Sequence, residues 1–171
     1  MKIVSAFLLS LLFAVPYASG QSTSAKPKPV IALTIRSATI FKAGALVPVH
    51  VVLQNISSHD IVIEREVRGT DCSIDVRDVV GKLPPDTKFG LVHNGHASIT
   101  DPSQIDPRDL NGKLVTIPVA AGKTWEWDLD VARFYDLSKP GRYLIFVEKP
   151  DPEDSSLAPV RSNTIEITIT A

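Results

Sequence analysis

The chain of 171 residues is poor in cysteine, in aromatic residues and in excess charge of either sign. Cys72 is the single cysteine, so no disulfide can form within the chain and an apolar core must hold the fold together. The formal net charge of −1 provides no basic surface of the kind that binds nucleic acids or anionic membranes, and we expect neither ligand. Cys72 alternates with Ile74 and Val76, which predicts a small buried side chain.

The sequence also lacks recognisable catalytic motifs. It contains no H-E-x-x-H pair of metal ligands and no G-x-S-x-G nucleophile turn. His93 and His96 are weak candidates for a metal site, because zinc or copper requires about three or four ligands. Asp101, Asp106 and Asp109 do not have the spacing of a calcium loop, because prolines interrupt them. We therefore predict no metal, no cofactor and no enzymatic activity.

The longest apolar run, IVSAFLLSLLFAV, is shorter than the roughly 20 residues that a membrane-spanning helix needs. A lysine precedes it, and Ala18 and Gly20 place small residues where signal peptidase prefers them. We predict a signal peptide over residues 1–20, a flexible tether over residues 21–29 and one folded domain over residues 30–171. The protein would then be exported to the periplasm or the extracellular space, with no membrane insertion after cleavage.

Most of the predicted domain alternates apolar and polar residues with a period of two, which indicates strands with one buried face. In TWEWDLDV, Trp125, Trp127 and Leu129 share one face, and acidic side chains occupy the other. The same pattern occurs in VIALTIRS, LVPVHVVLQN, DIVIEREV, CSIDVRDVVGK, LVTIPV, GRYLIFVEK and NTIEITIT. Because each sheet then has one apolar face, two sheets must cover each other. This predicts an all-β fold, an immunoglobulin-like antiparallel β-sandwich of seven to eight strands with no intrachain disulfide.

Pro140, Gly141 and Tyr143 form a predicted structural corner at the start of the segment GRYLIFVEK. Pro140 has a fixed φ and Gly141 can adopt a positive φ, so the chain is expected to reverse sharply here. The ring of Tyr143 then lies in phase with Ile145, pointing into the core. Its hydroxyl is expected to bond backbone within residues 135–138, as in the tyrosine corner of immunoglobulin-like sandwiches.

Four stretches resemble uncharacterised secreted bacterial immunoglobulin-like β-sandwich domains: LVPVHVVLQNISSHDIVI, SIDVRDVVGKLPPDTKFG, VAAGKTWEWDLDVARFYDLSKPGRY and RSNTIEITIT. The order of strands and turns also resembles, more distantly, the Bacillus-type intracellular proteinase inhibitor domain and the amino-terminal β domain of deuterolysin-type metallopeptidases. The resemblance implies a sandwich fold. It implies no peptidase activity, because the H-E-x-x-H motif is missing, and the predicted signal peptide separates the chain from the intracellular inhibitors.

Two segments interrupt the alternation, residues 82–112 and residues 149–161. Long loops of a sandwich often carry a binding surface. We expect an exported, non-catalytic binding module that contacts an unknown protein partner through loops or a sheet edge. Two alternatives are open: a proteinase inhibitor that uses residues 82–112, and a carbohydrate-binding accessory domain that uses its tryptophans. The candidate binding residues are His93, Asn94, His96, Asp101, Asp106, Arg108 and Asp109.

Overall fold

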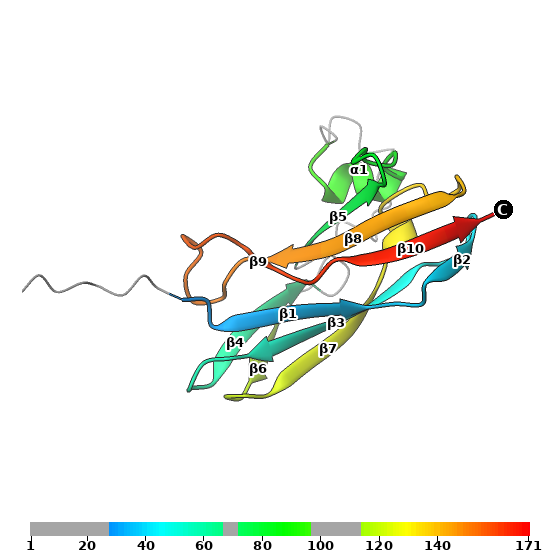
Figure 1. The fold of residues 1–171 in the computed structure, drawn as a ribbon. Coiled ribbons are helices and arrows are strands. Elements are labelled where there is room, and N and C mark those ends of the chain that lie inside the picture. Colours follow the sequence, from blue (N-terminus) through cyan, green and yellow to red (C-terminus); the bar gives the residue numbers. More distant parts are fainter. Residues whose placement is uncertain (1–27, 67–71, 97–113) are drawn as a thin grey trace, which may run out of the picture.

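The computed structural model describes residues 28–66, 72–96 and 114–171. These residues form ten strands, one short helix, α1 (Lys88–His93), and a 3₁₀ turn at Val131–Arg133 (Figure 1). The predicted signal peptide and most of the predicted tether lie outside the described residues. The strands are β1 (Ile31–Arg36), β2 (Ile40–Lys42), β3 (Pro48–Asn55), β4 (Ile61–Glu66), β5 (Ser73–Asp78), β6 (Leu114–Val119), β7 (Thr124–Asp130), β8 (Gly141–Lys149), β9 (Val160–Arg161) and β10 (Ile165–Thr170).

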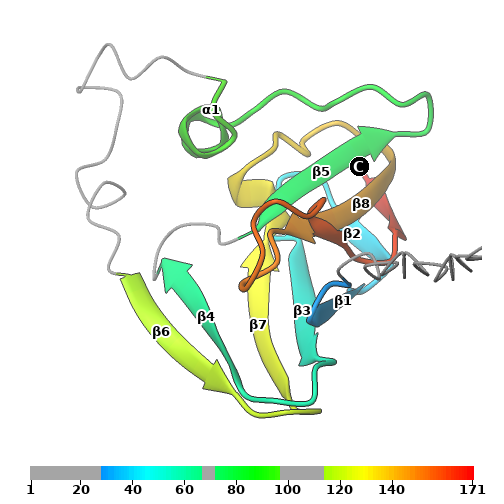
Figure 2. The ribbon, with the colours of Figure 1, turned by 90° about the vertical axis from the view of Figure 1, so that its left-hand side faces the viewer.

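Two sheets lie over each other and form the sandwich (Figures 1 and 2). The first has the order β1-β3-β7, and the second has the order β2-β10-β8-β5, with β9 also paired to β8. Strands β4 and β6 form a separate two-stranded antiparallel sheet that extends beside β7 (Figure 2). The strand pairs are antiparallel except for β2 and β10, which run parallel. The predicted all-β sandwich is confirmed.

The described residues contain two more strands than the sequence predicts. β2 has three residues and β9 has two, which is too short for an alternating pattern to stand out from a loop. β2 nevertheless completes the second sheet, because its Phe41 pairs with Ile169 in β10. The other difference is α1, which forms within residues predicted to be a loop.

The core lies between the sheets, and its side chains follow the predicted faces. In β3, Val49, Val51 and Leu53 are fully buried, while in β7 Trp127 is buried and its acidic neighbours are exposed. Each such apolar side chain contributes about 1.5–3 kcal/mol on burial, so the domain does not depend on a disulfide. Cys72 is only 3% exposed, as predicted. The second sheet contributes Ile74, Val76, Tyr143, Ile145, Val147, Ile167 and Ile169.

The predicted corner at the start of β8 is present, with two differences. The hydroxyl of Tyr143 donates to the carbonyl oxygen of Lys139 at 2.9 Å, one residue beyond the expected segment 135–138. Gly141 does not adopt a positive φ, so that part of the prediction is wrong. The residue is already the first of an extended strand, and the reversal takes place before it, at Pro140 and the preceding residues.

Candidate functional site

A pocket of about 270 Å³ lies between β5 and the carboxyl end of α1. The chain that follows the 3₁₀ turn forms a further wall. Figures 1 and 2 show α1 alongside β5, which is an edge strand of its sheet. The apolar part of the lining consists of Cys72, Ile74, Leu83, Phe134 and Tyr135. The pocket therefore lies beside an edge strand, β5, rather than at the loop end of the sandwich.

Helix α1 is held in place by its two ends and by one glycine. The hydroxyl oxygen of Thr87 accepts a hydrogen bond from the Gly90 N–H at 3.0 Å, and the Asn94 N–H donates to the Gly90 carbonyl at 2.8 Å. Gly90 is buried against Phe134, and a Cβ at this position would lie 1.9 Å from the Phe134 carbonyl oxygen. Gly95 then turns the chain with a φ of 70°. Only glycine at position 90 allows the helix to approach the opposite wall this closely.

Asp86 connects the end of α1 to the opposite wall. Its side chain is 12% exposed and accepts two hydrogen bonds, from Asn94 Nδ2 at 2.6 Å and from His96 Nδ1 at 2.7 Å. Its backbone forms an isolated β-bridge with Tyr135. The carboxylate thus fixes two of the predicted binding residues at the rim of the pocket.

His93 is oriented by aromatic contacts. Its ring stacks on Phe89 with a centroid distance of 3.7 Å, and its Nδ1 lies 3.1 Å from the Phe89 carbonyl oxygen. Phe89 also meets the edge of Phe134 at 5.0 Å and carries the guanidinium of Arg133 over its ring at 3.7 Å. The imidazole of His93 is therefore part of a packed stack, with a fixed orientation at the pocket wall.

The β5 side of the pocket carries an ion pair and a buried hydroxyl. Arg77 donates two hydrogen bonds to the carboxylate of Asp75, both at 2.8 Å. The hydroxyl of Tyr135 donates to the Ile74 carbonyl at 2.7 Å. Burial raises the pKa of Tyr135 to about 12, and the nearby carboxylates of Asp86 and Asp75 contribute to the increase. The hydroxyl therefore stays protonated and keeps its hydrogen bond at any ordinary pH.

The direction of the backbone groups in β5 follows from its neighbour β8. Val147 in β8 exchanges two hydrogen bonds with Ser162, on the side away from β5. Successive residues of a strand direct their N–H and C=O groups to opposite sides, so Phe146 points toward β5 and bonds its partner Asp75. Val76, the next residue, therefore directs both backbone groups away from the sheet.

The outer edge of β5 is covered by other parts of the protein. The Ile74 carbonyl accepts the hydroxyl of Tyr135, and the Asp78 N–H donates to the Lys82 carbonyl. Val76 is 0% exposed. This edge is therefore not an open template for another strand.

The edge of the first sheet, at β1, is closed by a single side chain. Asn163 accepts from the Ile35 N–H at 2.7 Å and donates to the Ile35 carbonyl at 3.0 Å. The amide thus occupies both outward main-chain groups of Ile35.

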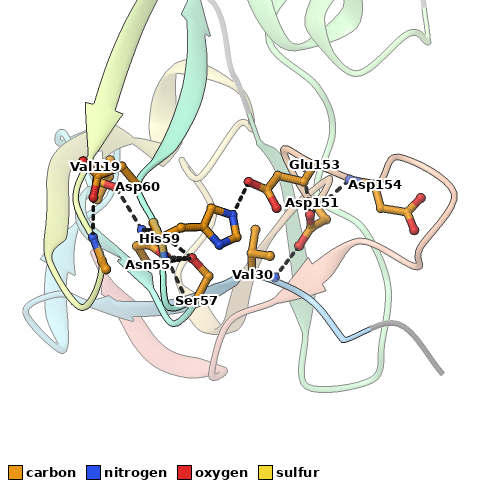
Figure 3. Close-up of polar contacts among 10 residues, drawn as sticks. Val30, Asn55, Ser57, His59, Asp60, Val119, Asp151, Glu153 and Asp154 are labelled. Atoms are coloured by element: carbon orange, nitrogen blue, oxygen red, sulfur yellow. Dashed lines mark hydrogen bonds and ion pairs between the residues drawn. The ribbon is translucent and has the colours of Figure 1, made fainter. Parts of the chain in front are cut away.

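The loop end of the sandwich holds a second polar cluster (Figure 3). Asn55 is fully buried and donates to the carbonyl of His59 at 2.8 Å, and His59 Nε2 lies 2.7 Å from Glu153. Asp151 is 3% exposed and accepts from the backbone N–H of Val30 at 2.7 Å and of Glu153 at 3.0 Å. These groups bond one another, so the cluster orders the loops at this end of the sandwich.

A third polar group lies on the outer face of the first sheet. His50 bridges Asp128 and Glu126, with each of its ring nitrogens 2.8 Å from a carboxylate oxygen. Both hydrogen bonds raise the pKa of His50 above its usual value, and the bond to Asp128 contributes more than the bond to Glu126. The group is exposed to solvent, and we interpret it as a surface charge network.

The structure brings together three of the predicted binding residues. His93, Asn94 and His96 line the pocket. Among the residues that the structure describes, no group of three side chains could hold a metal ion. No helix in those same ranges is long and apolar enough to cross a membrane. The remaining predicted binding residues lie outside the described residues: Asp101, Asp106, Arg108 and Asp109.

Sequence reasoning missed the other walls of the pocket. In the sequence, Asp75 and Arg77 belong to the polar face of a predicted strand. Phe134 and Tyr135 precede the predicted corner. The charged pair at a spacing of two was a usable signal, because such residues share one face of a strand. Nothing in the local pattern of Asp86 indicated its partners.

No protein-family model matches the chain, and no curated protein sequence does. Among solved structures, the β-glucosidase from Listeria innocua in complex with glucose is similar with a TM-score of 0.41 and 16% identity, over 85% of this chain and 17% of that chain. The same enzyme without ligand has a TM-score of 0.39 and 16% identity, over 84% of this chain and 16% of that chain. The chain thus spans about a sixth of the length of these enzymes. A likeness this distant carries no argument about the present protein.

Proposed function

We propose that this protein is an exported, non-catalytic binding module that takes up a side chain of a partner protein in the pocket between β5 and α1. The observation that carries the proposal is that this pocket is walled by three segments distant in sequence, namely β5, the carboxyl end of α1 and the chain after the 3₁₀ turn. Its mixture of apolar walls and fixed polar side chains is the usual composition of a binding pocket.

The surroundings of the tryptophans favour a protein ligand over a carbohydrate. Trp125 stacks on Trp127 with a centroid distance of 4.2 Å, and the guanidinium of Arg65 lies 5.2 Å from the centre of the Trp125 ring. Trp127 is buried. Little ring surface remains for stacking on a sugar.

Selection of random linear peptides displayed on phage against the mature protein tests the proposal. Bound peptides are expected to shift the amide resonances of Ile74 and Phe134, which line the pocket, measured by NMR. The amide of Leu33 in β1, on the other sheet, is the control and should not shift. If no peptide can be selected, or if selected peptides leave the Ile74 and Phe134 resonances unchanged, binding at this pocket is wrong.

A further inference from the structure

The backbone N–H of Ile74 is a buried hydrogen-bond donor on the side of β5 that faces the pocket. Ile74 directs its N–H and C=O groups away from β8, because the next residue, Asp75, pairs with Phe146 in that strand. The carbonyl oxygen of Ile74 accepts the hydroxyl of Tyr135, another residue of the pocket lining. The N–H has no hydrogen-bond partner among the described residues, although Ile74 is only 5% exposed. A ligand in the pocket can therefore supply the missing acceptor.

The state of the Ile74 carbonyl limits what such a ligand must offer. A pairing strand would bond both backbone groups of a residue, but the Tyr135 hydroxyl already occupies the carbonyl at 2.7 Å. The remaining N–H needs one acceptor oxygen and no donor. The N–H groups that Arg77 and Asn94 do not use within the protein belong to partly exposed residues, which water can reach. The buried N–H of Ile74 therefore distinguishes ligands by the acceptor that they carry.

The surroundings of this N–H disfavour a negative charge. The hydroxyl of Tyr135 lies against the Ile74 carbonyl. Burial raises the pKa of Tyr135 to about 12, and the carboxylates of Asp86 and Asp75 add to the increase. Arg77 has the smallest of these effects, in the opposite direction, and its charge is already paired with Asp75. A ligand carboxylate beside Ile74 would meet the same burial and the same neighbouring carboxylates, which favours an uncharged acceptor instead.

We propose that the pocket recognises a neutral carbonyl group, that of an asparagine or glutamine side chain, through the N–H of Ile74, and that it rejects the corresponding carboxylates. The carbon atoms of the same side chain contact Leu83 and Phe134, which belong to the apolar part of the lining. That the side chain comes from a partner protein rests on the proposed function. The preference for a neutral carbonyl is a property of the pocket and can be measured with small molecules.

Three probes of similar shape measure this preference. Propionamide has the neutral carbonyl of a glutamine side chain, butanone has the same carbonyl without N–H groups, and propionate has the charged carboxylate. Each is titrated into the mature protein at about pH 8.5, above the range in which histidine ordinarily titrates, and the amide hydrogen of Ile74 is followed by NMR. We expect both neutral probes to move this resonance downfield and to differ in affinity by less than the effect of one hydrogen bond, about threefold. Propionate should bind at least about tenfold more weakly.

The variant Asp75→Asn tests the role of charge. It keeps the shape of the side chain but leaves the guanidinium of Arg77 without its counter-charge. The disadvantage of propionate should then fall by about tenfold or reverse, while propionamide binds as before. Asp128→Asn is the matched control, because it removes the same charge on the outer face of the other sheet, and it should keep the full preference.

The inference is overturned if neither neutral probe moves the Ile74 amide resonance, if propionate binds as tightly as propionamide, or if Asp75→Asn leaves the preference unchanged. The peptide selection tests the proposed function separately. A carbonyl preference without any selected peptide would leave the inference standing and refute uptake of a partner side chain. Selected peptides that keep their affinity when each asparagine and glutamine is replaced by the corresponding acid would refute the preference alone.

Discussion

Replacement of Gly90 by alanine tests the contact that positions α1 over the pocket. In an isolated helix this substitution stabilises by about 0.5–1 kcal/mol, because glycine loses more backbone entropy on folding. Here the new Cβ would lie 1.9 Å from the carbonyl oxygen of Phe134. The obstacle is backbone and cannot rotate away, so the helix and Phe134 must separate by about 1 Å to reach even the shortest separations that real Cβ atoms show.

The sign of the effect therefore depends on the packing and not on helix propensity. Overpacking a buried site costs about 1–3 kcal/mol, which exceeds the gain from propensity. We expect Gly90→Ala to lower the free energy of unfolding by about 1–2 kcal/mol, which for a domain of this size lowers Tm by about 2–8 °C.

Gly141→Ala is the matched control. Its Cβ would lie 3.6 Å from the ring of Tyr143, which is ordinary van der Waals contact, and the residue has no positive φ. We expect a change in the free energy of unfolding within about 0.5 kcal/mol. Urea unfolding and thermal melts of both variants make the comparison. A Gly90→Ala protein as stable as the control would refute the close packing of α1 on Phe134.

Two further outcomes are expected. Tyr143→Phe removes the hydrogen bond at the corner and should destabilise by about 1 kcal/mol, measured by urea unfolding; an unchanged midpoint would contradict the corner. The raised pKa of His50 means that the folded state binds its proton more tightly than the unfolded chain does. The stability that His50 contributes is thus complete below the ordinary histidine pKa and is lost as pH rises through the raised value. The difference in Tm between the native protein and His50→Gln should shrink over that window, and a difference independent of pH would refute the bridge to the two carboxylates.

The sandwich could be predicted from the sequence because strand periodicity is a local property. In β7, the alternation of tryptophan and acid already separates Trp127 from Glu126, and the structure buries the first and exposes the second. β9 could not be predicted in this way, since two residues contain no period. The helix α1 has six residues, fewer than two turns, so an apolar stripe had no room to develop. Its remaining signals, the cap at Thr87 and the glycine at position 95, are equally common in turns.

The pocket depends on contacts between segments that are distant in the chain. The sequence indicates His93 and His96 as candidate binding residues, because histidine is chemically versatile and both lie in a long segment that interrupts the strand pattern. Their partners could not be inferred, because Asp86 meets Tyr135 across nearly fifty positions of sequence. The outward orientation of Val76 likewise depends on which side of β8 bonds Ser162, and pairing of that kind has no local signature.

The amide of Asn163 also joins the two sheets of the sandwich. It bonds both main-chain groups of Ile35 in β1, and the preceding residue, Ser162, bonds Val147 in β8. Apolar packing is not directional and by itself does not fix how one layer lies against the other. The short connection between β9 and β10 supplies that direction through hydrogen bonds to both layers.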